Sequence, residues 1–122
     1  MATLPLTDDH VLPADEPVLD LPAVARRLGV SVGRIRTLVA EHHVLAVSRD
    51  GEPVVPEVFF DDHGIAKHLT GLIGVLLDGG FSRDEAMEWM FTVQDDLGEY
   101  PARALHGHSA REMIRRAQAL AL

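Results

Sequence analysis

Arginine side chains are the residues of this sequence best suited to chemistry with a charged partner. Four of them lie close together along the chain: Arg26, Arg27, Arg34 and Arg36. A guanidinium group donates several hydrogen bonds in one plane, which suits phosphate oxygens and the edge of guanine. Ser31 and Thr37 add hydroxyl groups to the same stretch, and Gly33 leaves room for a partner to approach the backbone. These residue types in this order predict contact with a nucleic acid.

The distribution of charge favours a local interaction, although the 122-residue chain has a net charge of −8. Residues 1–20 carry five acidic side chains and no basic ones. Residues 21–49 carry five arginines against a single glutamate, which gives a local charge of +4. Residues 50–122 carry thirteen acidic and six basic side chains, a charge of −7. Because nucleic-acid affinity depends largely on neutralising phosphates, only the middle segment suits such a partner.

Two short helices are predicted to position these arginines. Asp20 is a suitable N-cap for a first helix over residues 21–28, and Gly29 suits the left-handed position that ends it. Ser31 then caps a second helix, expected over residues 32–42. Its inner face is expected to carry these residues: Val32, Ile35, Leu38, Val39 and His42. So short a connection makes the helices cross, which is typical of a helix-turn-helix.

The geometry of a helix-turn-helix on DNA assigns a role to each polar residue. The N-terminal part of the second helix enters the major groove, while the first helix contacts the backbone. We therefore expect Arg34, Arg36 and Thr37 to face base edges, with Ser31 and Gly33 at the start of the helix. Arg26 and Arg27 are expected to meet phosphates. The alternative is that the motif is only a packing unit whose arginines form a solvated face.

A β-hairpin is predicted directly after the second helix. Two runs with β-propensity, residues 45–48 and 53–59, flank an Asp50-Gly51 pair, which is typical of a tight hairpin turn. Pro53 and Pro56 are expected to place the second strand at an edge of the sheet. A hairpin in this position is a wing, and Arg49 near its turn is expected to contact phosphate.

The remaining segments complete a mainly α fold with a small β-hairpin wing. Residues 1–18 are acidic and contain three prolines, so a disordered tail is expected there. Residues 19–60 form the winged helix-turn-helix, and residues 61–122 form a C-terminal helical cluster packed on it. Apolar spacing predicts a helix near residues 69–77, and two Ser-x-x-Glu capping boxes, beginning at Ser82 and Ser109, each predict the start of another. Met87, Trp89, Met90 and Phe91 are interpreted as core.

Several other classes of protein are disfavoured by the sequence. The chain has no cysteine, so disulfides and thiolate metal sites are impossible. The pairs His42-His43 and His106-Gly-His108 have poor spacing for metal ligands and are assigned to a helix end and a turn. Carboxylates in expected loops (Asp61, Asp62, Asp95, Asp96 and Glu99) lack a matched nucleophile. We expect no enzyme activity, cofactor, export signal or membrane span, and a cytoplasmic location.

From residue 18 to residue 122 the sequence resembles actinobacterial winged helix-turn-helix DNA-binding proteins of mycobacterial type, which are linked to a membrane Ser/Thr kinase. The likeness is carried by Asp20-Leu-Pro22, Leu28-Gly-Val30, Val55-Pro56, Val58-Phe-Phe60, Gly71-Leu72, Asp78-Gly-Gly80, Trp89, Ala110-Arg-Glu112 and Arg115-Arg-Ala-Gln118. The resemblance implies DNA binding without catalysis, and a kinase that phosphorylates a threonine near the N-terminus. Thr3 is the nearest match, and Thr7 beside two aspartates is the alternative.

Two functional hypotheses follow from these patterns. The first is a double-stranded DNA-binding protein, either a transcriptional regulator or a nucleoid-associated factor, which acts as a monomer or a homodimer. The second is a protein-protein interaction module whose acidic C-terminal region repels nucleic acid. The basic segment favours the first hypothesis, and the charge of −7 over residues 50–122 favours the second.

Overall fold

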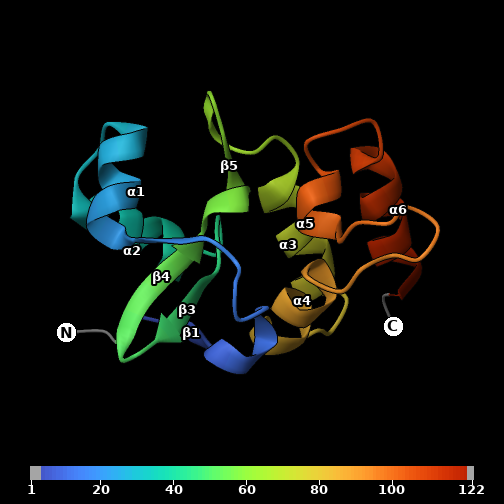
Figure 1. The fold of residues 1–122 in the computed structure, drawn as a ribbon, viewed down its shortest axis with the longest axis horizontal. Helices are drawn as coiled ribbons and strands as arrows, with labels where there is room; N and C mark the ends of the chain where they lie inside the picture. The colour runs from blue at the N-terminus through green and yellow to red at the C-terminus, as the bar shows by residue number, and fades with distance from the viewer. Residues whose placement is uncertain (1–3, 121–122) are drawn as a thin grey trace.

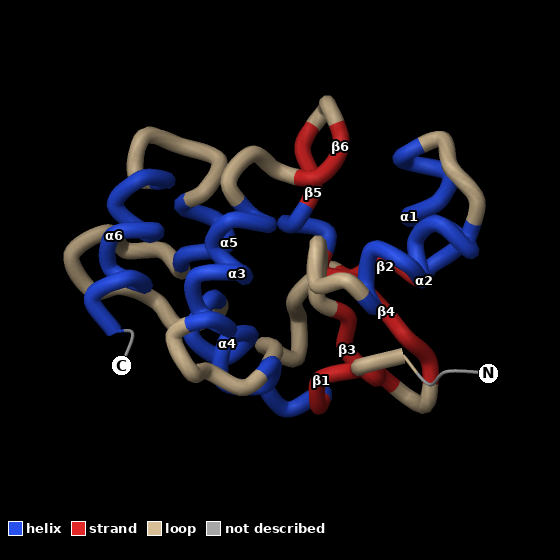
Figure 2. Tube along the Cα trace, turned by 180° about the vertical axis from the view of Figure 1, so that it is seen from behind, coloured by secondary structure: helices blue, strands red, loops and turns tan. Residues whose placement is uncertain are grey.

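The computed structural model describes residues 4–120, which form a sheet-containing half and an all-helical half (Figure 1). Helices α1 and α2 lie with a four-stranded sheet at one end of the molecule, and helices α3 to α6 occupy the other end (Figure 2). A second, two-stranded sheet of β5 (Phe60–Asp61) and β6 (Gly64–Ile65) projects between the two halves. The predicted fold class, a winged helix-turn-helix with a C-terminal helical cluster, is confirmed.

The helix-turn-helix forms through the caps that the sequence predicts. Asp20 accepts a hydrogen bond from the Ala23 amide at 2.8 Å and begins α1 (Leu21–Leu28). Gly29 then adopts a φ of 69°, the left-handed conformation that glycine tolerates best. The Ser31 hydroxyl accepts from the Arg34 amide at 3.1 Å and begins α2 (Val32–Ala40). This helix ends two residues before the predicted boundary, because His42 has a φ of 61° and turns the chain toward the sheet.

The hairpin forms at the predicted turn. Strands β3 (Ala46–Arg49) and β4 (Glu52–Pro56) pair in antiparallel fashion, with Arg49 opposite Glu52. Asp50 and Gly51 between them have φ values of 53° and 80°, and positive φ at both positions is what a type I′ turn requires. The right-handed twist of the strands favours this turn.

The prediction that the second strand lies at a sheet edge is wrong. The strand order is β1-β3-β4-β2, so β4 has a neighbour on each side. Strand β2 (Val18–Asp20) pairs with it, and Pro56 lies opposite Val18 in the register. A strand residue directs its amide toward one neighbour only, so each proline removes a single donor and leaves the other ladder intact.

The expected disordered tail is also wrong for residues 4–18. Strand β1 (Leu6–Asp8) runs parallel to β3, and a short 3-10 helix follows at Asp9–Val11. Val11 and Leu12 are buried in the core. The segment therefore contains enough apolar side chains to be held in place. Its parallel partner strand lies far along the chain and is not connected to it by a tight turn, so the sequence gives no local sign of the pairing.

Four helices build the C-terminal half. Helix α3 (Leu69–Asp78) and helix α4 (Arg83–Met90) occur where the sequence predicts them, and both parts of the Ser82–Glu85 capping box are present. A short α5 (Pro101–Ala104) was not predicted, and α6 (Ala110–Leu120) packs against α3. Met87, Met90 and Phe91 are buried as expected, whereas Trp89 is only partly buried against the same core. The core runs without a break from the sheet through Phe59 to these helices.

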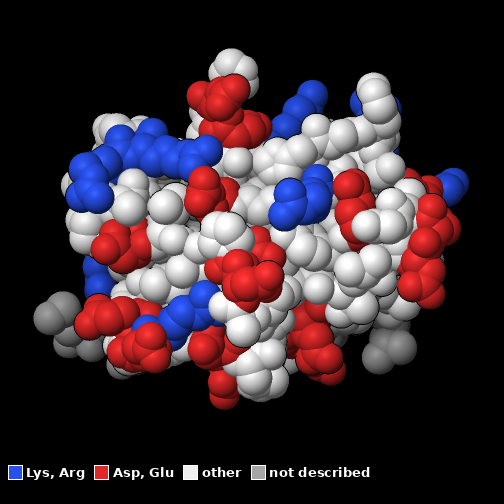
Figure 3. Space-filling model, in the orientation of Figure 1, with Lys and Arg blue, Asp and Glu red and all other residues white. Residues whose placement is uncertain are grey.

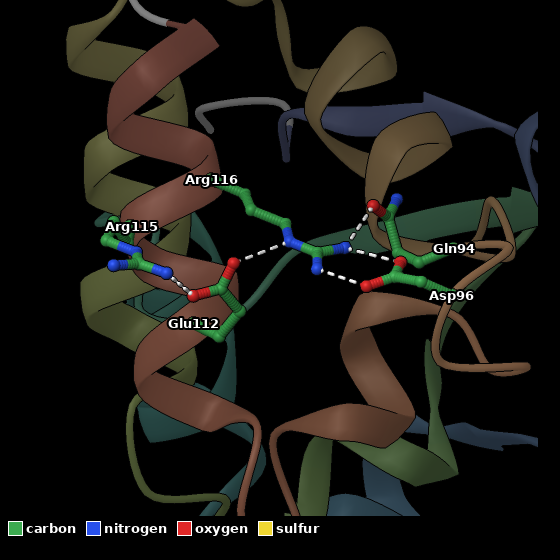
Figure 4. Close-up of polar contacts among 5 residues, drawn as sticks. All are labelled: Gln94, Asp96, Glu112, Arg115 and Arg116. Atoms are coloured by element: carbon green, nitrogen blue, oxygen red, sulfur yellow. Dashed lines mark hydrogen bonds and ion pairs between the residues drawn. The ribbon is translucent and has the colours of Figure 1, made fainter.

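In place of the second predicted capping box, Glu112 takes part in an ion-pair network (Figure 4). The Glu112 carboxylate accepts hydrogen bonds from Arg115 and Arg116 of its own helix, the latter at 2.8 Å. The Arg116 guanidinium also donates to Asp96 and to the Gln94 side chain. These contacts lower the pKa of Asp96 and raise that of Arg116, because each charge stabilises the other. The network ties the loop before α5 to α6.

A polar contact between Glu16 and Tyr100 joins the two halves of the molecule. Glu16, from the N-terminal segment, is 7% exposed, and its carboxyl group accepts a hydrogen bond of 2.7 Å from the Tyr100 hydroxyl. Arg103 in turn donates to the same hydroxyl at 3.0 Å. Burial, together with the neighbouring Glu16, raises the pKa of Tyr100 to about 12. The contact spans most of the chain and holds residues 4–18 against the C-terminal helices.

This pKa sets the expected response to alkaline pH. Tyr100 is the single tyrosine of the chain, so phenolate absorbance reports on it alone. Its folded pKa lies above the unfolded value near 10, so its contribution to stability is complete below about pH 10. That contribution is lost as the pH rises toward 12.

We expect the Tyr100→Phe variant to lose about 1–3 kcal/mol of unfolding free energy at neutral pH in urea titrations, because Glu16 loses its donor. An unchanged midpoint would contradict this role.

Candidate nucleic-acid interface

Helix α2 divides cleanly into a buried and an exposed face. Ile35, Leu38 and Val39 are buried against the core. The opposite face is exposed and carries Arg34, Arg36 and Thr37. A Cβ added to Gly33 would meet only the Ser31 hydroxyl, at 3.8 Å, so the start of the helix is open to a large partner. The residues predicted for a DNA groove therefore share the accessible part of α2.

Two of the predicted hydroxyl groups are committed to the helix itself. Ser31 caps α2 through its hydroxyl oxygen, and the Thr37 hydroxyl donates to the Gly33 carbonyl at 3.2 Å. Neither bond uses all the hydrogen-bonding capacity of its hydroxyl, since each oxygen has a further lone pair. Their first role is to hold the N-terminal turn of α2 in place.

Helix α1 contributes arginines with two different environments. The Arg26 side chain is exposed, and no carboxylate of residues 4–120 lies within ion-pair distance of it. Arg27 lies over the Phe60 ring, 5.7 Å from its centroid, and its guanidinium is 3.9 Å from Glu57. Arg34 and Arg36 of α2 likewise form no ion pair within the described part of the chain. We call Arg26, Arg27, Arg34 and Arg36 the α1–α2 arginines.

The surface around these arginines has an uneven charge (Figure 3). Lysine and arginine atoms form a band at the end of the molecule where α1 lies. Acidic atoms cover the projecting β5–β6 hairpin, where Asp61 ends β5 and Asp62 lies in the turn. The turn of the β3–β4 hairpin is also acidic, with Asp50 and Glu52 exposed. Exposed basic charge thus lies on the helices, and exposed acidic charge lies on both hairpin tips.

The Arg49 side chain, which was predicted to contact phosphate, has partners within the molecule. Its Nε lies 2.7 Å from an Asp9 carboxylate oxygen, and the same guanidinium donates to the Glu16 carbonyl at 3.4 Å. The Arg49 side chain is only 19% exposed. The pair fastens the N-terminal segment to β3. Sequence reasoning missed it because Asp9 falls in the segment expected to be disordered.

The two candidate phosphorylation sites have different positions. Thr7 lies in β1, is 1% exposed, and donates its hydroxyl to the Ala46 carbonyl at 3.3 Å. A kinase could reach it only after β1 had left the sheet. Thr3 lies outside the described residues.

Several histidines lie in turns or next to helix ends. His106 lies in the turn before α6, where its Nε2 is 2.6 Å from the Val58 carbonyl oxygen. His42 and His43 follow the end of α2, although the sequence predicts His42 as its last residue. Within residues 4–120 no three His, Asp or Glu side chains gather closely enough to hold a metal ion.

Two of the carboxylates of the predicted loops have structural roles. Asp61 accepts a hydrogen bond from the His63 amide at 2.7 Å, which lowers the pKa of this carboxyl group. Asp96 belongs to the Arg116 network described above. No helix among the described residues has the length and apolar character needed to span a membrane.

Crossed helices with an exposed, arginine-bearing second helix, followed at once by a β-hairpin, define a protein of the winged helix-turn-helix class. Comparison with known proteins places it more closely. Residues 3–60 match the family described as "DNA-binding protein Rv2175c, wHTH domain", and residues 66–121 match the "Rv2175c C-terminal domain of unknown function". The chain therefore belongs to the Rv2175c family. The first match begins at residue 3, in agreement with the ordered N-terminal strand.

Two comparisons cover nearly the whole chain. The DNA-binding protein Rv2175c of Mycobacterium tuberculosis is 42% identical over 134 residues, which include 99% of this chain and 91% of that protein. The NMR structure of Rv2175c superimposes with a TM-score of 0.86 at 40% identity, covering 99% of this chain and 95% of the other. The likeness thus includes both halves of the fold.

The different environments of the arginines generate a stability prediction. Arg49→Ala removes the partner of Asp9 and a donor to the Glu16 carbonyl, so we expect a loss of about 1 kcal/mol of unfolding free energy. Arg36→Ala removes an exposed side chain that has no ion pair within residues 4–120, and we expect a change within about 0.5 kcal/mol. Urea unfolding of both variants in parallel measures the difference. Equal losses would show that Arg49 is not a structural residue.

Proposed function

We propose that this chain binds double-stranded DNA, with α2 in the major groove and α1 against the phosphate backbone. The observation that carries the proposal is the exposure of Arg34 and Arg36 on α2, with no ion pair among the described residues to neutralise them. In a protein with a net charge of −8, such side chains are available to an external anion. The membership of the Rv2175c family supports the same function, because its M. tuberculosis relative is named a DNA-binding protein.

The orientation of the duplex follows from charge and shape. The open space around Gly33 allows the wall of a DNA groove to approach the start of α2, where the exposed part of the helix begins. The acidic tips of both hairpins disfavour close contact with phosphates, so the main contacts come from the helices. This differs from the expected arrangement, in which Arg49 joined the contact from the wing. It leaves a small interface centred on the α1–α2 arginines.

A salt series tests the proposal directly. If about three phosphates are neutralised, a fourfold rise in salt lowers the affinity roughly 40-fold. We expect Arg34→Ala and Arg36→Ala each to weaken binding by about 1–3 kcal/mol if the side chains contact bases. Fluorescence anisotropy of a labelled duplex measures both effects.

Arg49→Ala is the matched control, since it removes the same type of side chain from an engaged position. It should retain the affinity and the salt slope of the parent under conditions in which it is folded. If the parent protein shows no salt-dependent binding to any duplex, the interaction-module hypothesis replaces the present one.

The cellular role that fits this interface is a transcriptional regulator or nucleoid-associated factor acting in the cytoplasm. A monomer suits the small interface, while a homodimer would place two α2 helices on half-sites about one helical turn apart. The length and symmetry of a DNase footprint separate these two arrangements. A symmetric footprint of two half-sites would identify the homodimer.

We also propose that a Ser/Thr kinase regulates DNA binding through Thr3. Of the two candidate acceptors, Thr7 is buried in β1, which leaves Thr3 as the site for this proposal. A phosphate group adds about −1.5 to −2 of charge and competes with DNA phosphates for nearby arginines. The hypothesis rests on the family resemblance of the sequence.

The regulatory hypothesis has its own test. Thr3→Glu adds a negative charge. Thr3→Gln introduces a side chain of nearly the same shape as glutamate but without the charge. We expect the glutamate variant to bind DNA more weakly at low salt, and the difference to shrink as salt screens the charge. Equal affinities of the two variants over the whole salt series would dismiss the switch.

A further inference from the structure

Two exposed valines flank the start of α2. Among the described residues only four large apolar side chains are strongly exposed, and they include Val30 at 40% and Val32 at 38%. The expectation that Val32 faces inward with Ile35 is wrong, because Val32 is the first residue of the helix and lies beyond the edge of the core. Isolated exposed valines are common, so exposure alone identifies no function. The neighbours of Val32 are what make its position informative.

The side chain of Val32 shares its side of α2 with an arginine. Residues four apart on a helix lie one above the other, so Val32 is followed on that side by Arg36. Gly33, next to it, has no side chain, and a Cβ there would find open space beyond the Ser31 hydroxyl. The start of α2 therefore presents two methyl groups beside a guanidinium that has no ion pair in the described chain.

This combination matches one feature of the DNA major groove. Thymine places its C5-methyl group there, and guanine places two acceptors, O6 and N7, that an arginine can bind together. One turn of helix separates residues by about 6 Å, which is on the order of two base-pair steps. A protein partner is less suited to this site, because the apolar patch is small and arginines surround it.

We propose that Val32 packs against the C5-methyl group of a thymine, one or two steps from a guanine bound by Arg36. This inference rests on the proposed DNA-binding function and adds a base preference to it. Burial of a single methyl group corresponds to a change of about three- to fourfold in affinity, which is the size of preference we expect at that position.

The experiment compares duplexes that differ only in one methyl group. A duplex is first enriched from random sequences by repeated selection on the full-length protein. Each thymine in it is then replaced by deoxyuridine, one position at a time, and affinities are measured by fluorescence anisotropy. We expect one position at which the parent loses affinity three- to fourfold, while Val32→Ala binds the thymine and uracil forms equally.

Val93→Ala provides a matched control, since Val93 is an exposed valine in the loop after α4 and lies far along the chain from α2. It should keep the thymine preference of the parent. The inference is overturned if the parent binds both forms equally at every position, or if Val32→Ala keeps the preference. If the selection yields no duplex that the parent binds, the proposed function fails, and the inference with it.

Discussion

Ion pairing decides which arginines of this acidic protein remain open to an external anion. Arg49 is held by Asp9, and Arg116 by Asp96 and Glu112, so these cations serve the fold. Arg26, Arg34 and Arg36 have no such partner among the described residues and lie on the two helices of the helix-turn-helix. Net charge would place this chain among proteins that avoid polyanions. The pattern of ion pairs, rather than the net charge, determines where an anion can bind.

The local part of the fold could be predicted because its signals lie within a few residues of one another. Asp20, Gly29 and Ser31 act through neighbouring amides, so their positions determine α1, the turn and α2. The Asp50-Gly51 turn and the Ser82–Glu85 capping box are of the same kind. The exposed Arg34 and Arg36 follow from the helical period once Ile35, Leu38 and Val39 are assigned to the core.

The part that could not be predicted depends on distant pairing. Strand β1 finds its partner 40 positions later, and no pattern within residues 4–18 specifies that contact. The ion pair of Arg49 escaped sequence reasoning for the same reason, since its partner Asp9 belongs to that segment. Glu112 shows a different difficulty, because a carboxylate three residues after a serine can serve either the helix N-terminus or nearby arginines. Only the tertiary arrangement decides between them.

The parallel pairing of β1 with β3 has a consequence for biosynthesis. The first strand leaves the ribosome well before Ala46, its partner, and long before Asp84, whose carboxylate accepts a hydrogen bond from the Asp8 amide. Closing loops of this length is entropically costly and slow compared with forming α1 and α2. The N-terminal segment therefore cannot pair until β3 has been synthesised, and its contact with Asp84 requires α4 as well, whereas α1 and α2 can form from neighbouring residues alone.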